Sequence, residues 1–413
     1  MYDVIVVGAG AAGLLASATA ASRGLSVLIC ERNRRVGVKL RMTGKGRCNL
    51  TNNCRVDEAL ENIPTGARFL QSALNGMTPK SVMELFESIG VPLKTERGGR
   101  VFPESDKAGD VADALWRYAR DRGVELKRCR VTEIEEAGGE VAAVGTGDWR
   151  VRCRAVILCT GGASYPRTGS TGDGYAMAER LGHTVTPPKP SLVPLVADSG
   201  VCAEMQGLTL RNVRLQIYVA DKPDGKPVFE DFGELLFTHF GISGPLALSA
   251  SAHMRDFSGG GYRAVVDMKS ALDVRTLDAR IVRDFTKYSN SAFSNVVNRL
   301  VPGKLAPVLV RLTGIPPDTK AHSVTREQRA ALRGLLKEFT FDIAGTRPID
   351  EAVVTSGGVS LPELDPKTMQ SKLVRGLYFA GEIIDADAYT GGFNLQIAWS
   401  TAYAAGRYVL PDN

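Results

Sequence analysis

The sequence predicts an α/β protein whose parallel sheet is interrupted by an inserted domain of antiparallel strands and helices. Three observations support this fold class. A strand, a glycine-rich turn and a helix open the chain, and two further units of this kind begin near Arg154 and Gly376. Between them the pattern changes to alternating strands and then to helical periodicity. The two ends of the chain are therefore expected to build one domain around the insert.

The first 32 residues predict a dinucleotide site. An apolar run of strand length leads into Gly8, Gly10 and Gly13, which open a helix of small residues. The first glycine permits a tight turn, the second lets backbone approach a pyrophosphate, and the third allows the helix to pack closely on the strand. The helix N-terminus adds free N–H groups and a positive dipole end. Glu31 ends the next apolar run, where its carboxylate is expected to accept the ribose hydroxyls and to disfavour NADP.

Two later segments favour FAD as the dinucleotide, because an extended FAD contacts several strand ends. Thr160 and Gly161 follow a buried strand in "RAVILCTGGASYPRTGSTGDGYAMAERLGHT". Gly381 and Glu382 follow another in "GLYFAGEIIDADAYTGGFNLQIAWSTAYAAG", where Gly392 opens the last helix. A strand followed by Gly-Glu and a late glycine-capped helix is typical of the place where flavoproteins hold the ribityl chain and the pyrimidine edge of the flavin. The cofactor is expected to be noncovalent.

The insert is predicted from a change of pattern after the prolines at 187–190. The stretch "GLTLRNVRLQIYVADKPDGKPVFEDFGELLFTHF" reads as strands around a turn at Asp221–Pro227, as in an antiparallel sheet or barrel. Two following stretches, "ALDVRTLDARIVRDFTKYSNSAFSNVVNRLVPGKLAPVLVRL" and "TREQRAALRGLLKEF", read as helices. The predicted domains are residues 1–190 and 346–413 for the cofactor domain and residues 191–345 for the insert.

Composition limits the function classes. The 51 basic and 45 acidic residues leave a net charge of +6, too little by itself to indicate nucleic-acid binding. Seven dispersed cysteines indicate reduced thiols, and four dispersed histidines give no metal signature. No segment reads as a signal peptide or a transmembrane helix. We expect a cytoplasmic protein that acts on a small molecule, without a metal, membrane or nucleic-acid partner; the oligomeric state stays open.

The loop "TGKGRCNLTN", residues 43–52, carries no core-forming pattern. It ends a basic run with seven Lys or Arg residues and no acid, which is either a solvated face or an anion site. Gly44 and Gly46 would let backbone N–H groups approach a cofactor, while Lys39 and Arg47 would neutralise phosphate or a reduced flavin. Cys48 is interpreted as a small structural residue, with a thiol that reacts at the flavin as the alternative.

The chain resembles the BaiN-like (YhiN-like) family of bacterial flavoproteins. The resemblance rests on "VVGAGAAG", "GVKLRMTGKGRCNLTN", "GGASYPRTGSTGDGYAMAERLGH", "GELLFTHFGISGP" and "VTSGGVSLPELDPKTMQSKLVRGLYFAGEIIDADAYTGGFNLQIAWSTAYAAG". It implies a Rossmann-like two-dinucleotide-fold FAD-binding domain with an inserted β-barrel-like plus helical domain, and a loop at 43–52 that wraps the flavin. The residues expected to bind the cofactor are Gly8, Gly10, Ala12, Gly13, Glu31, Arg32, Lys39, Gly44, Gly46, Arg47, Cys48, Asn49, Val131, Thr160, Gly161, Gly381, Glu382, Gly392, Asn394, Leu395 and Gln396.

The implied chemistry is oxidation–reduction through flavin N5. Only one complete nucleotide fingerprint is present and FAD occupies it, so NADH or NADPH would bind transiently as electron donor. Proteins resembling this chain have been assigned to the reduction of steroid-like enones and others to amine oxidation. The sequence therefore predicts an NAD(P)H-linked reductase of a small substrate such as an enone. An aminoacetone-oxidase-like enzyme, a non-catalytic flavin-binding protein and a tRNA-modifying flavoenzyme are the alternatives. Tyr165, Tyr389 and His239 are candidate proton donors, and no catalytic residue is assigned.

Overall fold

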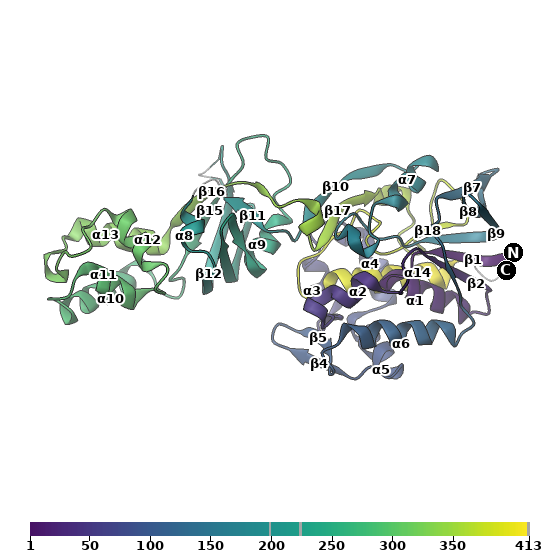
Figure 1. Ribbon diagram of the computed structural model, residues 1–413, viewed down its shortest axis with the longest axis horizontal. Helices are drawn as coiled ribbons and strands as arrows, with labels where there is room; N and C mark the ends of the chain where they lie inside the picture. The colour runs from purple at the N-terminus through teal and green to yellow at the C-terminus, as the bar shows by residue number, and fades with distance from the viewer. Residues whose placement is uncertain (198–199, 223–224, 411–413) are drawn as a thin grey trace. The chain divides into compact units, whose positions relative to one another are not determined.

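The structure is a computed structural model, and it describes residues 1–197, 200–222 and 225–410 (Figure 1). Contacts within the chain divide it into two compact units. One unit combines Met1–Ser191 with Pro348–Asn413, and the other is Leu192–Arg347. A mostly parallel sheet forms the centre of the first unit and a closed barrel lies in the second, which confirms the predicted fold class.

Five parallel strands, in the order β6-β2-β1-β9-β18, form the centre of the first sheet. They are β6 (Glu125–Arg128), β2 (Val27–Glu31), β1 (Tyr2–Val7), β9 (Trp149–Leu158) and β18 (Leu377–Phe379). The chain runs from β1 outward to β2 and β6, and then returns to the opposite side of β1 as β9. Ligands of open α/β sheets bind beyond the carboxyl ends of the strands at such a reversal.

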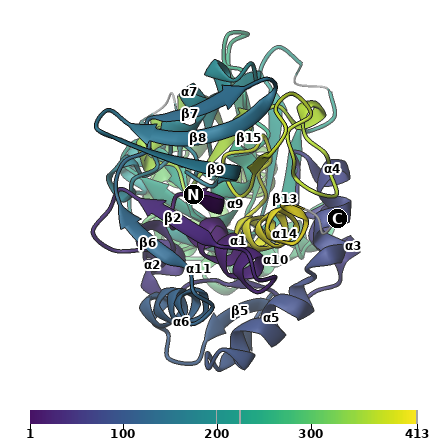
Figure 2. The same cartoon turned by 90° about the vertical axis from the view of Figure 1, so that its right-hand side faces the viewer.

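Both faces of this sheet are covered, which explains its continuous apolar runs. Helices α1 (Ala11–Ala21), α6 (Ala108–Arg120) and α14 (Phe393–Tyr408) share one core with the first face. Figure 2 shows α1 and α14 side by side, although they come from opposite ends of the chain. The second face packs against β7 (Glu133–Ala137), β8 (Glu140–Thr146) and α7 (Asp173–Arg180). The two chain ends therefore complete one domain.

Smaller elements surround this centre. They are α2 (Val38–Met42), η1 (Thr43–Gly46), β3 (Thr51–Asn52), α3 (Val56–Glu61), α4 (Ala67–Gly76), α5 (Pro79–Ser88), β4 (Leu93–Glu96), β5 (Arg100–Pro103), η2 (Pro166–Thr168), η4 (Ile349–Glu351) and η5 (Leu361–Glu363). Strands β3, β5 and β4 form a small antiparallel sheet.

The prolines at 187–190, after which the sequence pattern changes, lie within a strand. Strand β10 (Val185–Ser191) runs through them and pairs antiparallel with β17 (Val354–Val359). The pairing shifts register between Thr186 and Lys189. Because each strand of a two-stranded sheet has an unpaired edge, residues without an N–H donor are tolerated there.

The second unit contains a closed six-stranded barrel, in the order β11-β14-β13-β12-β15-β16. Its strands are β11 (Leu195–Ala197), β12 (Thr209–Val219), β13 (Phe229–Thr238), β14 (Gly241–Ser243), β15 (Tyr262–Asp267) and β16 (Phe339–Thr346). Residues 223–224 of the predicted Asp221–Pro227 turn lie outside the described residues.

Helices complete the second unit and share its apolar core with the barrel. They are α8 (Val201–Glu204), α9 (Gly244–Ser251), α10 (Val274–Lys287), α11 (Phe293–Leu300), α12 (Ala306–Thr313), η3 (Ala321–Ser323) and α13 (Arg326–Lys337). We call residues 274–337, which hold α10 to α13, the helical subdomain.

The described residues bear on three expectations from the sequence, which concern disulfides, metal sites and membrane-spanning helices. All seven cysteines lie in the described ranges and are unpaired. No group of three or more His, Cys, Asp or Glu side chains in these ranges could hold a metal ion. Among the described helices, none is long and apolar enough to cross a membrane.

Candidate cofactor-binding site

The glycine turn after β1 lies at the reversal point of the sheet. A Cβ added at Gly8 would lie 2.5 Å from the carbonyl oxygen of Cys159, and one at Gly13 would lie 1.8 Å from that of Gly8. Gly10 has no heavy atom within 4 Å of such a Cβ. The outer two glycines thus allow close packing, whereas the middle one borders open space. Gly10 also caps α1 without a side-chain hydrogen bond, so the first turn keeps donors for an anion.

Glu31 has a structural role that the sequence did not indicate. The residue is 6% exposed, and its two carboxylate oxygens accept hydrogen bonds from the backbone N–H groups of Ala9 and Asn33, each at 2.7 Å. The carboxylate therefore fixes the glycine turn to the end of β2. Each oxygen keeps a lone pair for a ribose hydroxyl. The neighbouring Arg32 binds Thr171 and Asp173 instead of remaining a free cation.

Two buried polar atoms near the carboxyl end of β9 have no hydrogen-bond partner among the described residues. They are Oγ1 of Thr160 and the hydroxyl of Tyr175. Buried hydroxyls are ordinarily hydrogen-bonded, so orphaned ones beside a ligand crevice fit a bound polar molecule. Gly161 follows with φ of 75°, which favours glycine, and Val131 is buried after β6. Together with the open space at Gly10, these features fit a dinucleotide.

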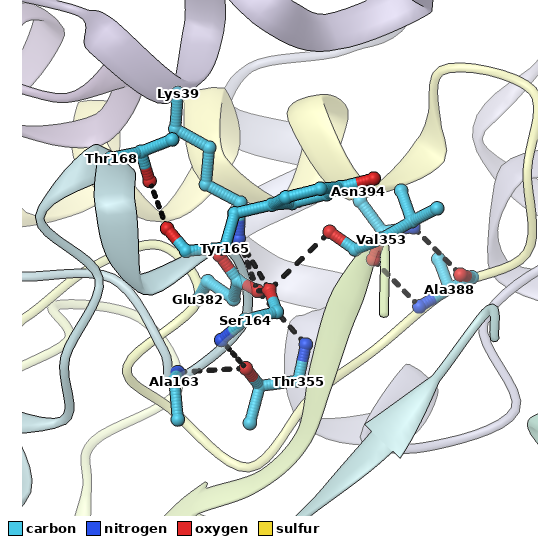
Figure 3. A network of polar contacts seen from close by, with 10 residues as sticks. All are labelled: Lys39, Ala163, Ser164, Tyr165, Thr168, Val353, Thr355, Glu382, Ala388 and Asn394. Carbon is cyan, nitrogen blue, oxygen red and sulfur yellow. Dashed lines mark hydrogen bonds and ion pairs between the residues drawn. The ribbon is translucent and has the colours of Figure 1, made fainter. Parts of the chain in front are cut away.

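A polar network connects four segments at this edge of the sheet (Figure 3). Lys39 Nζ donates to both carboxylate oxygens of Glu382, at 2.8 and 2.6 Å, and to Oγ of Ser164 at 2.7 Å. Glu382 also accepts from the backbone N–H of Thr355 at 2.9 Å. Thr355 Oγ1 in turn accepts from the N–H groups of Ala163 and Ser164. The charge of Lys39 is therefore balanced by protein and not left for a phosphate.

Tyr165 follows Ser164, a member of this network, in the chain. Its backbone adopts φ 50° and ψ 59°, a left-handed conformation that is uncommon for a residue with a bulky side chain. Figure 3 shows its ring extending across Ser164 and Glu382 toward Asn394. The Thr168 hydroxyl donates to the Tyr165 carbonyl at 2.7 Å and holds the turn.

The loop at 43–52 is held by a series of left-handed residues. Gly44, Lys45 and Cys48 have φ of 57°, 60° and 62°. A Cβ at Gly44 would lie 2.9 Å from the N atom of Asn49, whereas Gly46 borders open space. Cys48 is buried, and this burial raises the pKa of its thiol to about 12. A thiolate at Cys48 is thus disfavoured at neutral pH.

Arg47 does not extend toward open space. Its guanidinium binds Asp106 Oδ1 at 2.6 Å and Glu96 Oε1 at 2.5 Å, and its Cζ lies 4.2 Å from the centre of the Phe102 ring. Two carboxylates already balance this cation. The basic run thus contains ion pairs that could not be recognised from local sequence, because both acids come from a later strand and turn.

The loop is also attached to the start of α14. Thr51 Oγ1 donates to Gln396 Oε1 at 2.6 Å, and Trp399 Nε1 donates to the Leu50 carbonyl at 2.9 Å. A Cβ at Gly392 would lie 2.3 Å from the carbonyl oxygen of Thr51. With its amide N and O exchanged, Asn49 also bonds to Thr51 and Gly392. In this structure the loop therefore binds the N-terminal end of α14.

The remaining segment joins the two ends of the chain. A Cβ at Gly381 would lie 2.8 Å from the Cβ of Ala12, so two segments expected at the cofactor are in contact. The Asn394 side chain forms two hydrogen bonds with the backbone of Ala388. Its Nδ2 donates to the Ala388 carbonyl at 2.7 Å, and its Oδ1 accepts from the Ala388 N–H at 3.0 Å. Leu395, in the first turn of α14, packs against the core of the first face of the sheet.

Sequence reasoning missed Ser164 and Thr355 as members of the network. Both stand in segments that it did quote, one after Gly161-Gly162 and one in "VTSGGV". Their small hydroxyl side chains beside glycines carry little signal, because such residues are also common in ordinary turns. Among the candidate proton donors, His239 lies exposed in the second unit, and Tyr389 is in the loop that Asn394 holds.

Comparison with known proteins identifies the family of the chain. The chain matches the HI0933-like protein Rossmann domain over residues 2–408. It is 31% identical to a 3-dehydro-bile acid delta(4,6)-reductase of Clostridium scindens over 98% of both chains. It is 30% identical to a ribosomal RNA dihydrouridine synthase of Escherichia coli, over 99% of this chain and 98% of that one.

A solved structure shares the fold. The 3-ketosteroid-Δ4-(5α)-dehydrogenase of Rhodococcus jostii RHA1 is 16% identical, with a TM-score of 0.50 over 98% of this chain and 96% of that one. The resemblance to the BaiN-like (YhiN-like) flavoproteins is confirmed. The chain belongs to the HI0933-like family, and it is an FAD-dependent oxidoreductase.

Proposed function

We propose that this protein is an NAD(P)H-dependent reductase that saturates a carbon–carbon double bond conjugated to a carbonyl group. The observation that carries this proposal is its full-length similarity, at 30–31% identity, to enzymes named for two different reductions. A 3-oxo steroid with a Δ4 double bond is an enone, and the double bond reduced to form dihydrouridine is conjugated to a ring carbonyl. The named substrates differ in size but share the reacting group.

FAD, when bound, supplies hydride transfer: two electrons and a hydrogen from NADH or NADPH pass to the β carbon of the acceptor, and a proton is added at the α carbon. We assign the fingerprint at Gly8, Gly10 and Gly13 to this resident FAD, so the nicotinamide binds transiently. The residues at the other strand ends hold the flavin. Lys39 and Glu382 fix the segment after β18, and the loop at 43–52 fixes the start of α14.

We assign proton donation to Tyr165. Its phenol is half-buried, and its left-handed backbone costs on the order of 1–3 kcal/mol, strain that is often associated with a functional position. Tyr165 directly follows Ser164 of the network, and its ring points toward Asn394 in Figure 3. Neither His239, which is in the second unit, nor Tyr389 has this combination of features.

Two anaerobic half-reactions test the proposal: reduction of the flavin by NADH or NADPH, and reoxidation of the flavin by an enone. Wild-type protein loaded with FAD is mixed with NADH or NADPH, and bleaching of the yellow flavin reports the first half-reaction. A conjugated enone, such as 2-cyclohexenone or a 3-oxo-Δ4 steroid, is then added, and recovery of colour without air reports the second. We expect both steps in the wild type. Tyr165→Phe should bleach at the wild-type rate and recover at least tenfold more slowly, whereas the control Tyr389→Phe should resemble the wild type.

The alternatives give different results. Bleaching by amines and not by NADH or NADPH would replace the proposal with an amine oxidase. A flavin that no donor bleaches would indicate a binding protein. Equal recovery rates in Tyr165→Phe and the wild type would remove Tyr165 as donor and leave the reductase assignment intact.

A further inference from the structure

The positive charge of the chain is concentrated in the helical subdomain. Residues 274–337 contain 12 Lys or Arg residues and four Asp or Glu residues, a net charge of +8. The whole chain has a net charge of +6, so all other residues together have a net charge of −2. The prediction that nucleic acid does not bind rested on the whole-chain value, which conceals this distribution.

Several of these cations lack acidic partners. We define the basic face as four exposed residues, none of which forms an ion pair with any described carboxylate: Arg283, Lys287, Arg299 and Lys320. Other cations of the subdomain, such as Arg329 and Arg333, do pair, both with Asp278. Uncompensated like charges destabilise a fold through self-repulsion, so an unpaired group of this kind suggests a use outside folding.

Local contacts bring the four residues together. Lys287 Nζ and Arg299 Cζ lie 5.3 and 4.4 Å from the centre of the same Tyr288 ring. Arg283 precedes Lys287 by one helical turn on α10. Lys320 forms a backbone bridge with Ala292, in the loop that joins α10 to α11. Segments from α10, α11 and the stretch before α13 thus lie next to one another, and two of the four side chains share the ring of Tyr288.

A cavity of about 510 Å³ opens in the same subdomain, between α11, α12 and the turn at Gly314. Its walls are mostly apolar and its polar members include Asn298 and Arg311. It is lined by Ser294, Asn298, Ala306, Pro307, Val310, Arg311, Gly314, Ile315, Pro316 and Pro317. Bases of unpaired RNA stack on aromatic rings or on Arg guanidinium planes, and the cavity offers one such plane, that of Arg311, which also pairs with Glu204.

We propose that the helical subdomain is an RNA-docking surface, with phosphates on the basic face and an unstacked base in the cavity between α11 and α12. The inference rests on the proposed function, because uracil in RNA carries the double bond conjugated to a carbonyl that the reductase would saturate. Two relatives similar along the full chain are named ribosomal RNA dihydrouridine synthases. RNA is favoured over an acidic protein because it offers both the charges and the bases.

Salt-dependent binding to full-length, FAD-loaded protein tests this surface. The probe is a fluorescein-labelled 30-nucleotide RNA with a uridine-rich single-stranded loop, followed by anisotropy between 50 and 200 mM salt. Four phosphate contacts give a slope of about 2.8 in log affinity against log salt, so affinity falls about 50-fold over this range. Replacing Arg283, Lys287, Arg299 and Lys320 by Gln should remove most of this dependence and weaken binding at 50 mM by at least tenfold.

The control carries the same change of net charge on the first unit. It replaces Arg55, Lys80, Arg120 and Arg375 by Gln, all of them exposed cations in surface ion pairs. We expect this control to bind RNA within about twofold of the wild type. Circular dichroism and flavin content verify that both variants fold.

Three results would overturn the inference: no RNA binding by the wild type at 50 mM salt, equal loss in both variants, or equal competition by poly-glutamate at matched charge. The last result would assign the surface to an acidic protein. Bleaching by NAD(P)H and recovery with an enone are measured on the same samples. If these steps persist while RNA binding is absent, only the docking inference fails; if they are absent in the wild type, the proposed function fails.

Discussion

The ion pair between Lys39 and Glu382 gives a prediction whose size follows from the structure. Lys39 makes three hydrogen bonds through its ammonium group, and both side chains are about one-fifth exposed, at 22% and 20%. A fully exposed pair contributes about 0–1 kcal/mol, and loss of one partner in a fully buried pair costs about 3–5 kcal/mol. For this intermediate exposure we expect Lys39→Met to lower the free energy of unfolding by about 2–3 kcal/mol.

A double-mutant cycle isolates the pair itself. The four proteins are the wild type, Lys39→Met, Glu382→Gln and the double variant, each unfolded in urea without FAD. We expect the two single changes to be non-additive by about 1.5–2 kcal/mol, because the second change costs little once the partner is gone. A coupling below about 0.5 kcal/mol would show that the pair behaves as a solvated surface contact, and the reasoning from burial would be wrong.

Repeating the cycle with saturating FAD tests the sequence-based role of Lys39. If the ammonium group turns to the cofactor, as the sequence suggested, its coupling with Glu382 should fall in the loaded protein. If Lys39 remains a positioning residue for the segment after β18, the coupling should stay unchanged while FAD affinity falls in both single variants. Flavin fluorescence titration measures that affinity.

Four further predictions use other parts of the site. Gly13→Ala should prevent folding, since its Cβ would lie 1.8 Å from a carbonyl oxygen, whereas Gly10→Ala should fold and lose FAD affinity at least tenfold in a fluorescence titration. Glu31→Ala should lower the urea unfolding free energy by about 2–4 kcal/mol because the buried N–H of Ala9 and the partly buried N–H of Asn33 lose their acceptor. Cys48→Ser should retain flavin and NAD(P)H-driven bleaching, because the buried Cys48 thiol is protonated at neutral pH. A stopped-flow trace without bleaching would instead support the alternative of a catalytic thiol. Burial lowers the pKa of His183 against the opposing effect of Glu363, so protonation of the unfolded chain below pH 6.5 should reduce stability, and His183→Gln should flatten this slope between pH 7 and 5.

The fold class could be predicted from the sequence because the apolar runs, the glycine positions and the helical periodicity all indicate the same elements. The apolar run at Val4, the glycines after it and the small-residue helix all require one strand–turn–helix unit, and the structure contains it as β1 and α1. The barrel was predicted from alternation, which reports a strand with one buried face. Strand β10 was missed because prolines ordinarily disfavour strands, and only a tertiary partner, β17, makes an edge position available.

Site residues were harder to predict than the fold because a side chain's partner is often far along the chain. Glu31 was read as a ribose ligand since it ends a strand, yet its oxygens also hold two backbone groups near the turn. The sequence predicts which strand ends lie close together. It does not predict which hydrogen-bonding groups are used within the protein and which remain for a ligand. Ser164 and Thr355 are 191 residues apart and become neighbours only because folding places β17, which pairs with β10, beside the turn after β9.

The basic run from Arg32 to Arg47 illustrates how folding redistributes charge. Four of its seven cations pair with carboxylates from other segments: Arg32 with Asp173, Lys39 with Glu382, Arg41 with Asp113, and Arg47 with Glu96 and Asp106. The other three, Arg34, Arg35 and Lys45, are exposed and form no ion pair with a described carboxylate. In the proposed cofactor site, we expect the phosphates to bind the backbone donors at Gly10 and the start of α1, whose orientation the helix fixes. A run of basic residues that looks like an anion site is here mainly a set of structural ion pairs, whereas the cations of the basic face remain unpaired.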